Sequence, residues 1–366
     1  MTESPSRGDI TVVPGPAEVS AGPGPRPVPT TGHGPSPWRR LPALALAAAL
    51  LTLVVVLSIG VGARWFPPGE VWRVLLHPDG TEVSAVVHDL RVPRTLLGLL
   101  IGSALGVAGT LMQAVTRNPL ADPGLLGVNS GSSLAMVIGF TAVGTDSITG
   151  QLGWSFGGAV LAAVAVYAVG SQRTTGTTPI RLVLAGAAVS AALLAVVQGM
   201  ILLDPIALDR FRYWAVGALA GRDLGVTGAV TVPVLAGLLC AVALGRSLNA
   251  FALGEDSAHA LGARPGLVRA GALVSITLLC GAATAAAGPV SFLGLVVPHL
   301  ARRFAGADQR WGVAWALVLG PLLFLGSDVI GRVIDRPAEI QVGVVCAFLG
   351  APVLIALTRG SKAVSA

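Results

Sequence analysis

Beyond residue 38, long apolar stretches alternate with short clusters of Arg, Asp, Pro and Gly. A helix needs ~20 apolar residues to cross a bilayer, and the stretches have about that length. The pattern therefore predicts an all-α polytopic membrane protein with about ten transmembrane helices. The expected spans are 41–63, 95–116, 125–142, 153–169, 180–203, 225–244, 266–287, 290–304, 312–330 and 340–358.

Composition supports the bilayer as the solvent of this chain. The mean hydropathy is +0.77 and only 11% of the 366 residues are charged, which is too apolar for a soluble protein of this length. The net charge of +6 raises the question of nucleic acid, but a nucleic-acid binder gathers its basic residues on one face. Here they punctuate the apolar stretches, so we expect lipid and no nucleic acid as a partner.

The first 37 residues differ from the rest. They are rich in Pro, Gly, Ser and Thr and hold few large apolar side chains, so they cannot bury enough surface to offset the entropy of ordering. We expect a disordered tail at 1–37 and a transmembrane domain at 38–366. Arg39 and Arg40 precede the first span, and by the positive-inside rule we expect the N-terminus in the cytoplasm.

Two proline-containing breaks interrupt the apolar pattern. Pro119 and Pro123 follow the second span, and Pro289 follows the seventh. Proline denies the helix a backbone donor and disfavours helical geometry in the preceding residue. Non-helical backbone near membrane depth is tolerated against protein or a water-filled path. The similar placement of the breaks suggests an inverted repeat around a central pathway.

The chain shows no energy source of its own. The lone lysine is Lys362, so a phosphate-binding Gly-Lys-Ser/Thr loop is absent. Ion coupling usually leaves ionisable residues inside spans; Asp328 is the main candidate, and its other interpretation is a residue near the membrane interface. The histidines and cysteines form no catalytic or metal-binding cluster, so we expect no catalytic residue, metal or cofactor. An ion-coupled secondary transporter and a membrane-embedded enzyme or sensor stay open.

Several motifs together resemble the FecCD-type permeases of siderophore, haem and cobalamin importers. The resemblance covers essentially residues 41–358, in order and at the expected spacing. The motifs are RVPRTL at 91–96, GTLMQ at 109–113, NPLADPGLLG at 118–127, RLVLAG at 181–186, LGEDSA at 253–258 with LG at 261–262, GPVSFLGLVVPH at 288–299, and the segment 343–352.

The resemblance implies a type II ABC importer permease with ten helices. Its implied partners are cytoplasmic ATP-binding subunits, which bind the ATP, an extracytoplasmic solute-binding protein, and a second permease subunit in a homodimer or a heterodimer. Ferric siderophore is the favoured cargo because it is the commonest in the family, and haem and cobalamin remain alternatives.

The resemblance also implies three groups of functional residues. Cytoplasmic coupling helices are expected at about 248–264, with an ordinary solvated loop as the alternative. Arg91, Arg94 and Arg332 match positions that receive glutamates of the binding protein, although interfacial arginines also commonly anchor spans. Gate positions near the inner constriction are matched in two segments, where the prolines could also simply end helices. The coupling residues are Gly254, Glu255, Asp256, Ala258, Leu261 and Gly262, and the gate residues are Asn118, Leu120, Thr178, Pro179 and Ile180.

Overall fold

The computed structural model describes residues 37–62, 64–144, 147–171, 179–252, 258 and 264–362. Residues 34–366 form one compact unit and residues 1–33 another, so the predicted tail at 1–37 lies almost wholly outside the described residues. Within the described residues every regular element is a helix. The predicted all-α class is confirmed.

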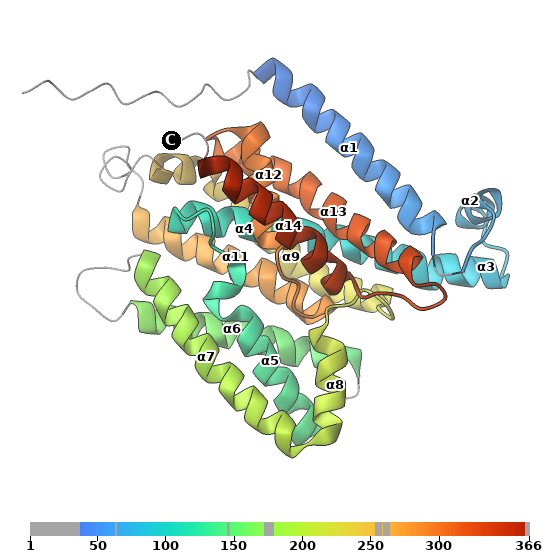
Figure 1. Cartoon of the computed structure of the whole chain (residues 1–366), viewed down its shortest axis with the longest axis horizontal. Coiled ribbons are helices and arrows are strands. Elements are labelled where there is room, and N and C mark those ends of the chain that lie inside the picture. Colours follow the sequence, from blue (N-terminus) through green and yellow to red (C-terminus); the bar gives the residue numbers. More distant parts are fainter. Residues whose placement is uncertain are drawn as a thin grey trace, which may run out of the picture. The chain divides into compact units, whose positions relative to one another are not determined.

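Figure 1 shows the described helices in the colours of their order along the chain. In chain order they are α1 (Pro37–Gly60), α2 (Pro68–Leu76), α3 (Glu82–Ala85), the π-helix η1 (Val86–Arg91), α4 (Val92–Thr116), the 3-10 helix η2 (Pro123–Leu126), α5 (Val128–Ile138), the π-helix η3 (Gly139–Val143), α6 (Ile148–Gly170), α7 (Pro179–Leu203), α8 (Pro205–Ala215), α9 (Leu224–Ala252), α11 (Pro265–Ala287), α12 (Leu293–Ala305), α13 (Gln309–Ile334) and α14 (Val342–Lys362).

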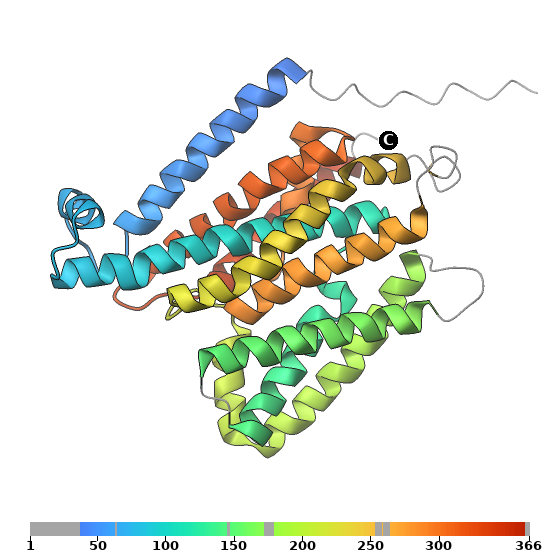
Figure 2. The same cartoon turned by 180° about the vertical axis from the view of Figure 1, so that it is seen from behind.

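Helices α4 and α11 form the centre of the unit. The most apolar window is 78% buried for α4 with its preceding turns and 72% for α11, against 11% for α1 and 22% for α7. Helix α4 packs against α9, α11, α12 and α13, and Figure 2 shows α4, α9 and α11 side by side. Gly102 and Gly106 face Gly320 and Pro321 of α13 with no room for a Cβ. Small residues thus bring the two backbones into contact, which is how helices associate in membranes.

A second group of helices, α5 to α8, joins the centre through α6 and α11 (Figure 1). Gly131 of α5 and Gly158 of α6 each face the carbonyl of the other, so these two helices also touch backbone to backbone. Many side chains of α7 are exposed, including Leu184 and Leu202. Apolar side chains exposed in the isolated chain need lipid or another subunit to cover them.

Seven helices of the described residues are long and apolar enough to cross a membrane. They correspond to the expected spans one, two, four, five, six, seven and nine. Two of the other three spans hold shorter apolar helices, Val128–Val143 and Val342–Ala356, and the third holds α12, which has 13 residues. The count of ten therefore stays a prediction, although a helix lies in each expected span.

Helix α9 is longer than the apolar pattern indicated. The predicted span ends at residue 244, whereas the helix runs on to Ala252. No proline occurs between Pro233 and Pro265, and Leu248 and Phe251 are buried. Packing of these two side chains therefore accompanies the last turns of α9. The predicted inner segment starts within this helix, as a continuation of the sixth span.

Candidate functional site

The outer end of the bundle is defined as the end that holds Arg94, and the inner end as the one that holds Arg117, after the orientation predicted from the sequence. A buried charged cluster lies at the outer end. Arg94 of α4 donates to both oxygens of Asp328 of α13, at 2.8 to 3.1 Å. It also donates to Glu339 at 2.6 Å. Arg332, one turn beyond Asp328, also donates to this carboxylate, at 2.7 Å from its Oδ2 atom.

The same cluster ties α1 to the centre of the molecule. Arg332 donates to the carbonyls of Ser58 and Val61 at 2.8 and 3.1 Å and to the Ser58 hydroxyl at 2.7 Å. Ser58 in turn shares a 2.7 Å hydrogen bond with Thr95 of α4. One carboxylate and its arginines therefore hold together α1, α4, α13 and the turn before α14. Since a buried charge is tolerated when it is paired and hydrogen-bonded, Asp328 is accounted for as a structural anchor.

This geometry bears on the two interpretations of Asp328. The residue is not an isolated acid in a span, because it is fully buried and bonded to two guanidinium groups. A proton or sodium site would need a carboxylate whose charge is free to be neutralised by the ion. The pairing disfavours Asp328 as a coupling site.

The three predicted docking arginines lie close to one another at this end, but they are enclosed. Arg91 and Arg332 are buried, and the side chain of Arg94 is 11% exposed. Arg91 donates to the carbonyls of Ile59, Gly60 and Arg64 at 2.7 to 2.9 Å. Their role in docking stays a prediction. The described structure shows their charges turned to the chain itself.

At the inner end, the first break is built as a tight turn. Helix α4 ends at Arg117, whose φ of 50° is left-handed, and the Asn118 side chain accepts a hydrogen bond from the backbone N–H of Leu120 at 2.9 Å. Asp122 then caps η2 by accepting from Gly124 at 2.7 Å. The backbone N–H groups that follow each proline thus donate to side chains, as expected for Asn and Asp in turns.

The second break lies against the first. It follows Gly288 and ends at Phe292, whose φ of 67° is left-handed. A Cβ on Gly294, just inside α12, would lie 2.7 Å from Pro123 and 3.5 Å from Asp122. Across the same junction Thr284 of α11 donates to Asn129 of α5 at 2.9 Å. The two interruptions of the helical pattern therefore meet inside the molecule, where irregular backbone is buried against protein as membrane depth requires.

The predicted gate residues are only partly described. Leu120 and Ile180 expose 54% and 72% of their surface, Asn118 forms the tight turn after α4, and Pro179 begins α7. Thr178 lies outside the described residues. Leu120 and Ile180 are therefore exposed on the surface of the isolated chain.

Most of the predicted coupling residues lie outside the described residues, namely Gly254, Glu255, Asp256, Leu261 and Gly262. Ala258 is helical and fully buried. Directly before this segment, the ring of Phe251 contacts two arginines, with Arg117 at 4.7 Å and Arg269 at 5.4 Å from its centre. Arg117 also donates to the Phe251 carbonyl at 2.6 Å. The entry to the segment is therefore attached to the ends of α4 and α11.

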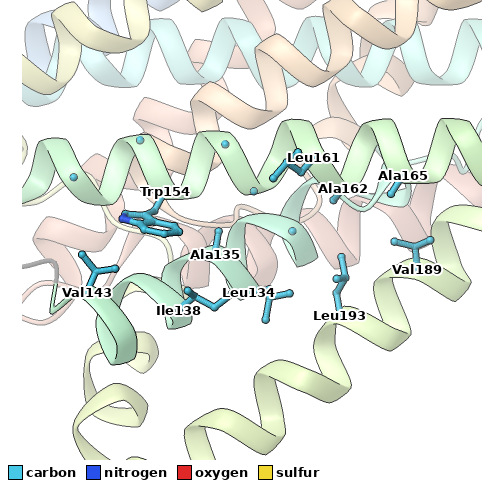
Figure 3. A pocket seen from close by; sticks show the side chains of 15 residues that line it. Leu134, Ala135, Ile138, Val143, Trp154, Leu161, Ala162, Ala165, Val189 and Leu193 are labelled. Carbon is cyan, nitrogen blue, oxygen red and sulfur yellow. The ribbon is translucent and has the colours of Figure 1, made fainter.

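A large cavity of about 840 Å³ opens between α5, α6 and α7 (Figure 3). Its lining is apolar apart from the indole of Trp154, and the residues that line it include Leu134, Ile138, Leu161 and Leu193. None of these lining residues is charged. A polar chelate needs a few well-placed polar groups for recognition, so we do not assign this cavity as a chelate site.

The FecCD transport family model matches residues 50–360 of this chain. The chain belongs to the FecCD transport family. A FecCD permease is a membrane subunit for transport and not an enzyme, and the ATPase is a separate partner in these systems.

Curated relatives of this FecCD permease share much of its length. It is 46% identical over 299 residues to the ferric enterobactin transport system permease protein FepD of Escherichia coli (strain K12), covering 82% of this chain and 89% of that protein. It is 37% identical over 294 residues to a siderophore transport permease, YfiZ, of Bacillus subtilis (strain 168), covering 80% and 88%. It is 34% identical over 269 residues to the hemin transport permease HmuU of Yersinia pestis, covering 72% and 80%.

A solved structure agrees on the fold. The FecCD permease superposes with a TM-score of 0.77 and 25% identity on an inward-facing structure assigned to the metal-chelate type of ABC transporter, covering 87% of this chain and 99% of that one. The predicted family is therefore confirmed, and the predicted all-helical architecture has a counterpart in a solved transporter.

Several residues of these sites carried little signal in the sequence. Asp328 and Arg332 are four apart on one helix, a spacing that predicts a pair, but the contacts of Arg332 with α1 and of Asp328 with Arg94 join positions more than 200 residues apart. Phe251 lies in an ordinary apolar context in the sequence, and no local pattern predicts its contacts with Arg117 and Arg269.

Proposed function

We propose that this chain is the permease subunit of an ATP-driven importer that carries a ferric siderophore across the bacterial cytoplasmic membrane. Membership of the FecCD family carries the proposal, together with relatives named for ferric enterobactin and siderophore transport. The meeting of the two helix breaks supports it physically, because broken helices are where transporters place their pathways. The N-terminus is proposed to lie in the cytoplasm.

A second permease subunit, identical or different, would complete the pathway. The support is the exposure of large apolar residues on α7 and α14, such as Leu202, Leu203 and Phe348. Leu120 and Ile180 would then meet their counterparts or other apolar residues near the inner end. Together with Asn118, Thr178 and Pro179 they are the proposed gate.

Two ATP-binding subunits are proposed to act on the segment that follows α9. The attachment of Phe251 to Arg117 and Arg269 supports a mechanical path, because a displacement of this segment would pull on the ends of α4 and α11. The residues proposed to contact the ATPase are Gly254, Glu255, Asp256, Ala258, Leu261 and Gly262. Changing Glu255 to Arg should abolish ATP-driven uptake while membrane insertion is retained, and unchanged uptake would refute the assignment.

An extracytoplasmic binding protein is proposed to dock at the outer end through Arg91, Arg94 and Arg332. Because these arginines are enclosed, docking would require Arg94 to exchange an internal carboxylate for one of the partner's. Attraction between opposite charges would also speed the encounter. Changing Arg94 to Glu should weaken binding of the partner, and Arg73→Glu at an exposed position serves as the control for long-range charge. Equal affinity of Arg94→Glu and wild type would reject the docking role.

The decisive experiment measures uptake of labelled ferric siderophore into vesicles that contain the chain, with and without its ATPase and ATP. Uptake only with both supports the proposal. Uptake that follows an imposed proton or sodium gradient without ATP would favour an ion-coupled secondary transporter instead. Parallel assays with haem and cobalamin identify the cargo, and the hemin permease among the relatives makes haem the first alternative.

A further inference from the structure

A second cavity, of about 250 Å³, lies at the inner end, and its lining includes none of the proposed gate, coupling or docking residues. Its walls come from the end of α4, the last residue of α9, α12 and the start of α13. This volume has room for several water molecules, and therefore for a small polar group. The polar residues that line it are Thr110, Gln113, Arg117, Arg302, Asp308 and Gln309.

The two arginines that line the cavity, Arg117 and Arg302, supply positive charge and hydrogen-bond donors. Arg117 uses one nitrogen to donate to the Phe251 carbonyl, and Arg302 uses one to donate to the Gln113 side chain. A guanidinium carries five N–H donors in a planar fork, so each keeps donors beyond these contacts. Two forks at one cavity match the oxygens of a phosphate group, which arginine binds with two parallel hydrogen bonds.

The one acid in the lining is already engaged. Asp308 caps α13 by accepting from the backbone N–H of Arg310 at 3.0 Å, and the same oxygen accepts from the Asn249 amide at 2.8 Å. Asn249 completes the arrangement by accepting from the backbone N–H of Gln309 at 2.7 Å. One oxygen of the carboxylate thus helps to hold α9 on α13. With two arginines and one carboxylate, the lining carries an excess of positive charge.

We propose that this cavity binds a phosphate-bearing anion through Arg117 and Arg302, either a free phosphate or the headgroup of an anionic phospholipid. Basic pockets between helices on the cytoplasmic side of a membrane favour such headgroups. The bound anion would bridge the end of α4 to α12, beside the point where α9 continues into the proposed ATPase-contacting segment. It would thereby stiffen the inner end. The site itself does not depend on which cargo is carried.

The test uses the full chain purified in detergent and, separately, in lipid nanodiscs. In detergent, binding of inorganic phosphate is measured at constant ionic strength. In nanodiscs of phosphatidylcholine, retention of added phosphatidylglycerol is measured by native mass spectrometry. The test variants are Arg302→Gln and the double change Arg117→Gln with Arg302→Gln. Arg303→Gln is the matched control, because Arg303 neighbours Arg302 on α12 but does not line the cavity.

The double variant should bind at least one of the two probes about tenfold or more weakly, as expected for losing charge-assisted hydrogen bonds, and Arg303→Gln should bind like wild type. Arg302→Lys keeps the charge without the fork, so it should lose less affinity than Arg302→Gln, and it serves if the double variant does not fold. Arginine-dependent binding of phosphate alone identifies a free anion, and of phosphatidylglycerol alone a lipid. Wild-type affinity of the glutamine variants for both probes, or an equal loss in Arg303→Gln, would overturn the proposal.

Discussion

The two ends of the bundle use arginine in opposite ways. At the outer end Arg94 and Arg332 are enclosed and share one buried carboxylate, and their contacts join four segments. At the inner end Arg117 and Arg302 are exposed, and each makes a single side-chain hydrogen bond across to a neighbouring element. Buried charges that pair with one another hold their elements together firmly, whereas contacts of exposed side chains break at little cost. The comparison indicates that movement should begin at the inner end and pivot on the outer one.

The largest effect is expected from Asp328→Asn. The change keeps the shape of the side chain but removes the carboxylate that the two arginines share, so that Arg94 keeps Glu339 while Arg332 loses its ion-pair partner. Breaking a buried pair in this way costs ~3–5 kcal/mol. Chemical unfolding in detergent should show the loss. Asp209→Asn is the control, since Asp209 pairs with Arg212 at an exposed site. Equal unfolding free energies for the two variants would show that the buried charged cluster does not stabilise the outer end more than an exposed ion pair does.

A somewhat smaller effect is expected where the two breaks meet. Gly109 of α4 faces the Gly294 carbonyl with no room for a Cβ, so Gly109→Val should force α12 away from α4. Overpacking of this kind costs ~1–3 kcal/mol, measured as a lower unfolding free energy. Gly199→Val on α7 is the matched control because open space surrounds Gly199. If Gly109→Val were as stable as the control, the packing where the two breaks meet would be loose. Rigidity would then be confined to the charged cluster at the outer end.

A third prediction separates stability from transport at the inner end. Phe251→Leu keeps an apolar side chain but removes the ring that lies under Arg117 and Arg269. Loss of these contacts should lower the unfolding free energy by only about 1 kcal/mol. ATP-driven uptake should fall more steeply than stability, because the joint that transmits the displacement is loosened. Uptake that stays at the wild-type level would show that the ATPase moves the chain by another route.

Most of the architecture could be predicted because it depends on local pattern. Apolar stretches of bilayer length gave helices at each expected place, and prolines at 119, 123 and 289 marked the irregular segments. The end of α9 could not be predicted in the same way. The apolar pattern ended this span at residue 244, whereas burial of Leu248 and Phe251 accompanies the continuation of the same helix to Ala252.

The sites were less predictable because they depend on distant partners. The resemblance to a family located Arg91, Arg94 and Arg332 at one end. The enclosure of Arg94 and Arg332 depends on Ser58, Asp328 and Glu339, most of which lie far away in the sequence. A charge in a sequence does not reveal whether it faces solvent or a counter-charge. That difference decides whether an arginine is available to a partner, so a docking surface is harder to predict than a span.

The smallest effect is expected at the exposed outer pair of Arg73 and Asp79, which are 3.2 Å apart. Hydrogen bonds from Thr81 hold the pKa of the Asp79 carboxyl below its ordinary value, so the pair is fully charged at neutral pH. Even so, Arg73→Ala should leave the unfolding free energy unchanged within error, because solvent and side-chain entropy offset the attraction between exposed charges. Arg94→Ala, which removes an enclosed arginine of the same end, should destabilise the protein clearly. A measurable loss for Arg73→Ala would mean that burial is not what distinguishes the arginines, and charge alone would then have to explain the rigidity of the outer end.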